Sequence, residues 1–80
     1  MELVKLTEYL VQELLPNADN ISVKKIESDT DIVIQVLVPN ECMSLIIGKG
    51  GSIANSIRTI VQAAAYVKKI GKVRINIDSL

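Results

Sequence analysis

The run from Ile32 to Val38 constrains the fold more than any other part of this chain. Six of its seven residues are apolar and five are β-branched, and Gln35 is the single polar member. Residues of this kind favour a β-strand that is covered on at least one face. The rest of the chain must therefore supply a partner strand and an apolar cover.

The segments before this run predict a helix and a partner strand. Residues 2–15 carry Leu and Val at helical spacing and are followed by Pro16, which indicates an amphipathic helix that stops there. Residues 21–27 have the composition of a strand, and the polar turn of residues 28–31 joins them to the apolar run. The two strands are expected to form a hairpin.

The segments after the run predict two helices and a last strand. Asn40 is the expected N-cap of a short helix that ends at Ile47, where glycines follow. A longer helix is predicted from Ser52 to Lys69, with a glycine two residues beyond it as a stop. Its apolar positions are Ile53, Ile57, Ile60, Val61, Ala64 and Val67. Residues 72–78 alternate and predict a strand whose inward side chains are Val73, Ile75 and Ile77.

Length and composition favour one small binding domain. The chain has 80 residues, of which 49% are hydrophobic, so it can bury one core but is too short for an enzyme with a deep cleft between domains. Its only aromatic residues are Tyr9 and Tyr66, and it has no Phe, Trp or His, so the core must be aliphatic. Recognition of nucleic-acid bases by a sheet of exposed aromatic rings is largely excluded.

Cys42 is the single cysteine, which excludes an internal disulfide and a cluster of thiolate metal ligands within one chain. That composition fits a reducing compartment. No apolar run reaches about 18 residues, the length of a membrane span, and the first residues lack the basic-then-apolar order of a signal peptide. We therefore expect a cytoplasmic protein without membrane contact.

The charges divide unevenly along the chain although their sum is zero. Residues 1–40 hold three basic and seven acidic side chains, a net charge of −4, and residues 41–80 hold six basic and two acidic ones, a net charge of +4. A one-sided site for a polyanion would leave this asymmetry, and so would an ordinary solvated surface. The charge pattern alone leaves both interpretations open.

The segment Gly48-Lys49-Gly50-Gly51 lies between the two predicted helices and suits a phosphate group. Glycine lacks a Cβ atom and reaches positive φ at little cost, so the backbone can come close to a sugar-phosphate chain. The helix that begins at Ser52 points its free N–H groups at this segment, and Lys49 adds a positive charge. The alternative is that the glycines only shape a tight turn between two helices.

The stretch from Ile46 to Gly51 resembles the GxxG signature of KH domains, and the order helix, strand, strand, helix, helix, strand is similar to their type II arrangement. Residues 52–58 resemble the small bacterial single-KH proteins of the KhpA family. One difference is that many KH domains have a branched aliphatic residue where this chain has Ala54. The resemblance covers essentially the whole chain. It implies an α+β fold over residues 1–80, with a three-stranded sheet covered by three helices.

The resemblance also implies the binding of single-stranded RNA without catalysis, as an RNA chaperone or a post-transcriptional regulator. The residues expected to contact RNA are Ile46, Ile47, Gly48, Lys49, Gly50, Gly51, Ser52 and Arg58. Ile46 and Ile47 cannot both point into the core if their helix ends at Gly48, so one of them is expected to line an aliphatic groove, with the strand at residues 32–38 as the other wall. Arg58 either follows the RNA backbone or is merely solvated.

Cations also gather at the far end of the longer helix. Lys68, Lys69 and Lys72 flank this end, where positive charges favour the negative pole of the helix dipole. We assign them mainly that structural role.

Other nucleotide-binding and catalytic motifs are missing. The chain has no Walker A loop, and a dinucleotide fingerprint beginning at Gly48 would need glycine in place of Ile53. There is no His, Cys42 has no base to activate it, and most carboxylates lie in the acidic half. We therefore expect no enzyme, no cofactor and no metal site.

Two classes of function remain open. One is the RNA-binding module, and the other is an interaction module that docks a KH-containing partner, because a lone KH domain holds only about four nucleotides. The resemblance implies a homodimer, or a heterodimer with a protein similar to KhpB/Jag. Ile53 is the candidate dimer contact, because it lies at the margin of the helix's inward stripe. That stripe is predicted to consist of Ala54, Ile57, Val61 and Ala64.

Overall fold

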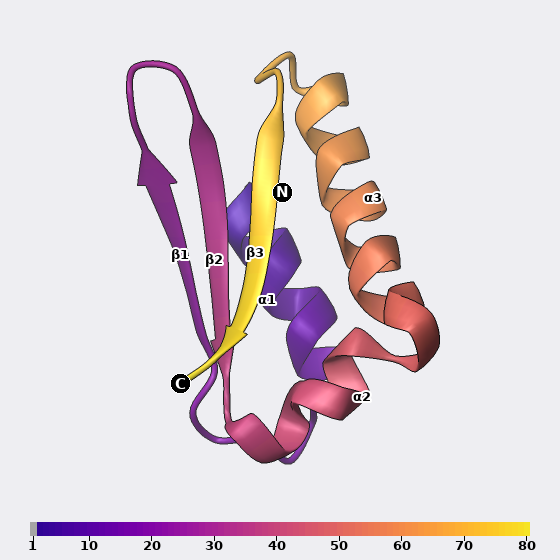
Figure 1. The fold of residues 1–80 in the computed structure, drawn as a ribbon. Coiled ribbons are helices and arrows are strands. Elements are labelled where there is room, and N and C mark those ends of the chain that lie inside the picture. The colour runs from indigo at the N-terminus through magenta and orange to yellow at the C-terminus, as the bar shows by residue number, and fades with distance from the viewer. Residues whose placement is uncertain (1) are drawn as a thin grey trace.

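Strand β2 (Ile32–Val38) is the middle strand of a three-stranded sheet in the computed structural model, which describes residues 2–80. It pairs antiparallel with β1 (Ser22–Glu27) and parallel with β3 (Val73–Ser79). One face of this sheet carries the helices (Figure 1). They are α1 (Leu3–Leu14), α2 (Met43–Ile47) and α3 (Ser52–Val67), with the short 3-10 turns η1 (Asn40–Cys42) and η2 (Lys49–Gly51) on either side of α2. The predicted order of elements and the α+β fold class are confirmed.

The core lies between the sheet and the helices and is aliphatic. Ile34, Val36 and Val38 of β2 are fully buried, whereas the residues that alternate with them are only partly buried, so β2 is covered on one face. β3 follows the predicted alternation, with Val73 and Ile75 buried and Ile77 partly buried. The aliphatic core predicted from the lack of Phe and Trp is confirmed, because neither tyrosine is among the buried residues.

The start of the short helix differs from the prediction. Asn40 does not cap α2, because the chain already turns at η1, where the N–H of Cys42 donates to the carbonyl of Pro39 at 2.9 Å. Cys42 is the N-cap residue of α2, and no side chain forms the cap hydrogen bond. An Asn after Pro is a capping signal only where the helix begins directly, and here a 3-10 turn comes first.

The buried stripe of α3 is close to the predicted one but narrower. Ala54, Ile57 and Val61 are buried as predicted, and Ala65 takes the place expected for Ala64. Two apolar positions predicted for this helix are exposed instead, Ile60 at 45% and Val67 at 78%. They are exposed because α3 contacts the rest of the domain along one stripe and presents its remaining surface to solvent.

The end of α3 is built around a lysine in the left-handed conformation. The N–H of Ile70 donates to the carbonyl of Ala65, and the N–H of Lys69 donates to that of Tyr66, both at 3.0 Å. This pattern normally places glycine where Lys69 stands, with φ of 61°. Gly71, predicted as the stop, lies two residues further on and has φ of 98°.

Two negative findings apply to residues 2–80. None of the helices in this range combines the length and the apolar character that a membrane span requires. The same residues contain no group of three or more His, Cys, Asp or Glu side chains that could hold a metal ion.

Candidate nucleic-acid interface

The loop Gly48–Gly51 joins α2 to α3 through three positive-φ glycines. Helix α2 ends where Gly48 turns to φ 74° and ψ 177°, a combination that is almost restricted to glycine. Gly50 and Gly51 then adopt left-handed values, with φ of 63° and 79°. These angles turn the chain sharply from one helix into the next within a few residues.

The glycines have different surroundings. A Cβ atom on Gly48 would lie 2.7 Å from Cγ1 of Ile53, so Gly48 has to be glycine for packing as well as for conformation. A Cβ atom on Gly50 would have no neighbour within 4 Å. The backbone at Gly50 is therefore open to solvent, which leaves room for another chain to approach it.

The N-terminus of α3 has no side-chain cap, and only the N–H of Ser52 is used within η2, where it donates to the carbonyl of Lys49. Its N-cap residue is Gly51, which has no side chain to accept hydrogen bonds from the first turn, and that turn contains no acidic residue. Lys49 and Ser52 are exposed beside it. Exposed N–H groups, the positive end of the helix dipole and a lysine favour an anion at this place.

The two isoleucines before the loop point in different directions. Ile46 is fully buried in the core, whereas Ile47 is 37% exposed. The expectation that only one of them faces the core is confirmed. Ile46 as an RNA contact is wrong for this conformation, since the side chain has no accessible surface, and Ile47 is the one that can contact a ligand.

The strand beside α3 is β3, and the prediction that β2 forms this wall is wrong. Both edges of β2 are paired within the sheet, so only β3 has an edge directed towards α3 (Figure 1). Nε of Arg58 donates to the carbonyl of Ile75 at 3.1 Å, and Nε2 of Gln62 donates to the carbonyl of Val73 at 3.2 Å. These bonds tie α3 to the free edge of β3.

Arg58 is held between helix and strand. Its Nη1 also donates to Oδ1 of Asn55 at 3.1 Å, and the side chain is partly buried. It therefore lies on the side of α3 that faces β3, in line with the loop. Its guanidinium is oriented by the protein and is neither freely solvated nor buried.

A scan against protein families matches the KhpA/KhpB KH domain over residues 4–77. The chain belongs to this KH family. It is 38% identical over 65 residues to the RNA-binding protein KhpA of Caldanaerobacter subterraneus, covering 81% of this chain and 87% of that protein. It is 34% identical to KhpA of Clostridium perfringens, covering 91% and 96%, and 37% identical to KhpA of Aquifex aeolicus, covering 84% and 82%.

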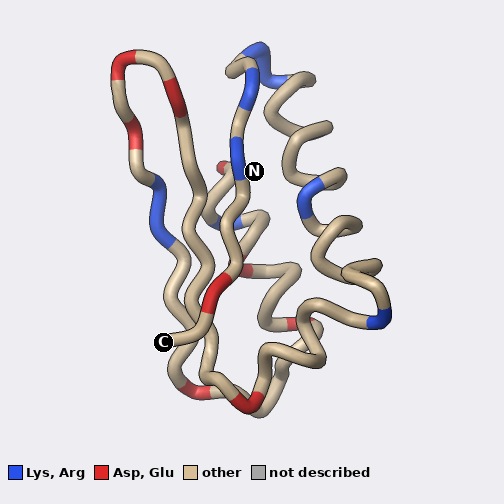
Figure 2. Tube along the Cα trace, viewed as in Figure 1, with Lys and Arg blue, Asp and Glu red and all other residues tan. Residues whose placement is uncertain are grey.

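The charges of this KH domain separate in space as they do along the sequence. Figure 2 shows basic residues at the loop before α3, along α3 and at the turn from α3 to β3. Acidic residues gather at the tip of the β1–β2 hairpin and at the opposite end of the domain, and others lie on α1 and on the second half of β3. The cations of the second half of the chain therefore lie on the α3–β3 side, and Lys24 and Lys25 on β1 lie at the other edge of the sheet.

Sequence reasoning missed Asn55 and Gln62 as members of this side of the KH domain. They stand three residues before and four residues after Arg58, so all three lie on one face of α3. The helical spacing could have grouped them. The strand that they face could not be predicted, because it depends on the order of strands in the sheet.

Proposed function

We propose that this chain binds single-stranded RNA without catalysis and holds the sugar-phosphate backbone at the loop Gly48–Gly51. The observation that carries the proposal is the open backbone at Gly50, one residue before the N-cap of a helix that has no side-chain cap, with the exposed Lys49 between Gly48 and Gly50. Membership of the KhpA/KhpB family supports it, since the relatives are named RNA-binding proteins.

The expected contacts divide between backbone and bases. The backbone from Gly48 to Ser52 and the Lys49 side chain hold phosphates. Arg58 contacts the RNA where it passes β3, and the exposed part of Ile47 lies under a base. A KH module of this kind covers about four nucleotides. In the cell we propose a cytoplasmic RNA chaperone or post-transcriptional regulator.

The salt dependence of binding tests this mode. If about three phosphates are neutralised, the slope of log affinity against log salt concentration should be near −2, at about −0.7 for each phosphate of a single strand. Fluorescence anisotropy of a labelled single-stranded RNA at several salt concentrations measures it. A slope near zero would mean that the backbone is not the main contact.

A second candidate function, docking of another KH chain, has one observation in its favour. A hollow of about 320 Å³ lies between α1 and α3. Its apolar lining includes Leu14 and Ile60, which are 39% and 45% exposed, and Ile53. We propose this surface as the contact for a homodimer, or for a heterodimer with a KhpB/Jag-like protein. A dimer would place two loops on one RNA, which would raise the avidity of the protein for that RNA.

Substitution of this surface should give a monomer. Covering one such apolar side chain contributes about 1.5 to 3 kcal/mol per copy, so Ile53→Asp should abolish self-association. Because the Ile53 side chain also lies against Gly48, Ile60→Asp is the cleaner variant, and it should have the same effect without disturbing the loop. Sedimentation over a concentration series measures both. A wild type that is monomeric throughout, or variants that associate equally well, would exclude this interface.

A further inference from the structure

The far end of α3 presents an aromatic ring to solvent. Tyr66, on the last turn of α3, is 82% exposed and is the most exposed of the large apolar residues in residues 2–80. A ring that is exposed to this degree adds little to the core. The chain has only one other aromatic residue, Tyr9 on α1, which is 54% exposed.

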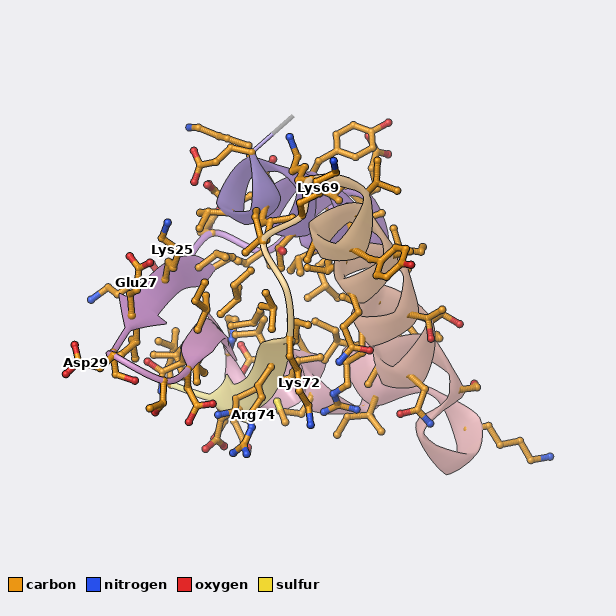
Figure 3. All side chains as sticks on the ribbon, turned by 90° about the horizontal axis from the view of Figure 1, so that it is seen from above. Lys25, Glu27, Asp29, Lys69, Lys72 and Arg74 are labelled. Atoms are coloured by element: carbon orange, nitrogen blue, oxygen red, sulfur yellow. The ribbon has the colours of Figure 1, made fainter. Side chains whose placement is uncertain are left out.

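Each of two hollows beside Tyr66 includes a lysine. Tyr66 and Gly71 line two open hollows, one of about 410 Å³ that includes Gln62 and Lys72 and one of about 450 Å³ that includes Lys69. Figure 3 looks down on this end and shows Lys69 and Lys72 projecting from opposite sides of the turn. An exposed ring flanked by cations is the arrangement that proteins use to stack a nucleic-acid base while holding its phosphates.

Lys69 occupies a position that side chains disfavour. Its φ of 61° is the left-handed conformation that glycine normally supplies at a helix end. Helix termination alone would be served better by glycine there. A lysine here adds a positive charge at the negative pole of the helix dipole, and the same charge is available to a phosphate.

This end of α3 is continuous with the RNA loop. Asn55, Arg58, Gln62 and Tyr66 follow at spacings of three, four and four, so they form one stripe of α3 on the β3 side. Ser52 and Tyr66 are 14 positions apart on α3, a distance of about 21 Å at about 1.5 Å per residue. A stacked single strand covers that distance in about six nucleotides at about 3.4 Å each.

We propose that Tyr66, Lys69 and Lys72 form a second nucleotide site, in which a base stacks on the Tyr66 ring and the two lysines hold the neighbouring phosphates. RNA longer than the segment held at the loop then runs along the α3–β3 side and reaches this site. The proposal rests on RNA binding at the loop and adds a second contact to the same strand.

Substitution of Tyr66 should therefore weaken the binding of long RNA and leave the binding of short RNA unchanged. Stacking of one base changes affinity by about 5- to 150-fold. Tyr66→Ala should weaken binding of an unstructured twelve-nucleotide RNA in this range and change binding of a four-nucleotide RNA less than about twofold. Tyr66→Phe should bind both like the wild type, because the ring is kept. Lys69→Gly should weaken only the long RNA while the melting temperature does not fall.

Tyrosine fluorescence reports on the ring directly. In Tyr9→Phe the only tyrosine is Tyr66, and the twelve-nucleotide RNA should quench its emission while the four-nucleotide RNA should not. Tyr9→Ala is the matched control for loss of an exposed ring elsewhere and should bind both RNAs normally.

Three results would overturn the second site. The first is that Tyr66→Ala loses affinity equally for the short and the long RNA. The second is that its affinity for both RNAs is unchanged. The third is that it loses self-association in sedimentation while its RNA affinity is unchanged, which would make Tyr66 a protein contact. A failure of the loop is recognised separately, because then the wild type does not bind the four-nucleotide RNA, or binds it no better than Lys49→Asp/Gly50→Asp does.

Discussion

Replacement of Lys49 and Gly50 by aspartate should abolish RNA binding and leave the domain folded. The double variant puts two carboxylates where phosphates are expected and removes one positive charge, so attraction becomes repulsion at the N-terminus of α3. The fold should tolerate both changes. Lys49 is exposed, and a Cβ atom on Gly50 meets nothing within 4 Å. Aspartate is also among the residues that enter the left-handed region most readily.

Circular dichroism and thermal melting of the double variant establish that the fold is kept. Lys24→Asp/Lys25→Asp is the matched control, because it introduces the same carboxylates in place of two exposed lysines on β1 at the other edge of the sheet. This control should retain most of the affinity. If it loses as much as the loop variant, net charge and not the loop determines binding.

Gly48→Ala should destabilise the domain by roughly 3 kcal/mol. The backbone at φ 74° and ψ 177° costs a non-glycine residue about 1 to 3 kcal/mol, and overpacking against Ile53 at 2.7 Å adds a contribution of similar size. For a domain of this length that is a large part of the total free energy of unfolding. Urea unfolding monitored by circular dichroism measures it.

Gly50→Ala is the control for this loss of stability. Gly50 has a positive φ, but a Cβ atom there has no neighbour, so the substitution should lower the free energy of unfolding by only about 1 kcal/mol. A double-mutant cycle with Ile53→Ala separates the two causes at Gly48, because the shorter side chain relieves part of the clash and should give a measurable coupling energy. Equal destabilisation by Gly48→Ala and Gly50→Ala would show that the Ile53 contact does not limit this position.

The elements of the fold could be predicted because local patterns encode them. The β-branched run of β2, the alternation in β3 and the helical spacing in α1 and α3 each fix a type of structure within a few residues. The glycines of the loop could be assigned for the same reason, since positive φ and the junction of two helices are local properties.

The composition of the candidate site could be predicted only in part, because tertiary arrangement decides it. Whether Ile46 or Ile47 enters the core depends on how α2 is rotated against the sheet. The assignment of β2 as a wall failed because the strand with the free edge is set by strand order, which no single segment records. The low aromatic content argued against base recognition by a sheet of rings, but it could not show that Tyr66 is exposed. That exposure depends on where α3 leaves the core.

An anisotropy titration with a four-nucleotide single-stranded RNA tests the loop most directly. It compares the affinity of the wild type with that of Lys49→Asp/Gly50→Asp. An RNA of this length fills one KH loop and cannot reach the far end of α3, so other contacts contribute least. We expect saturable binding by the wild type and none by the variant. Equal affinity of the two proteins, with native circular-dichroism spectra for both, would contradict RNA binding at Gly48–Gly51.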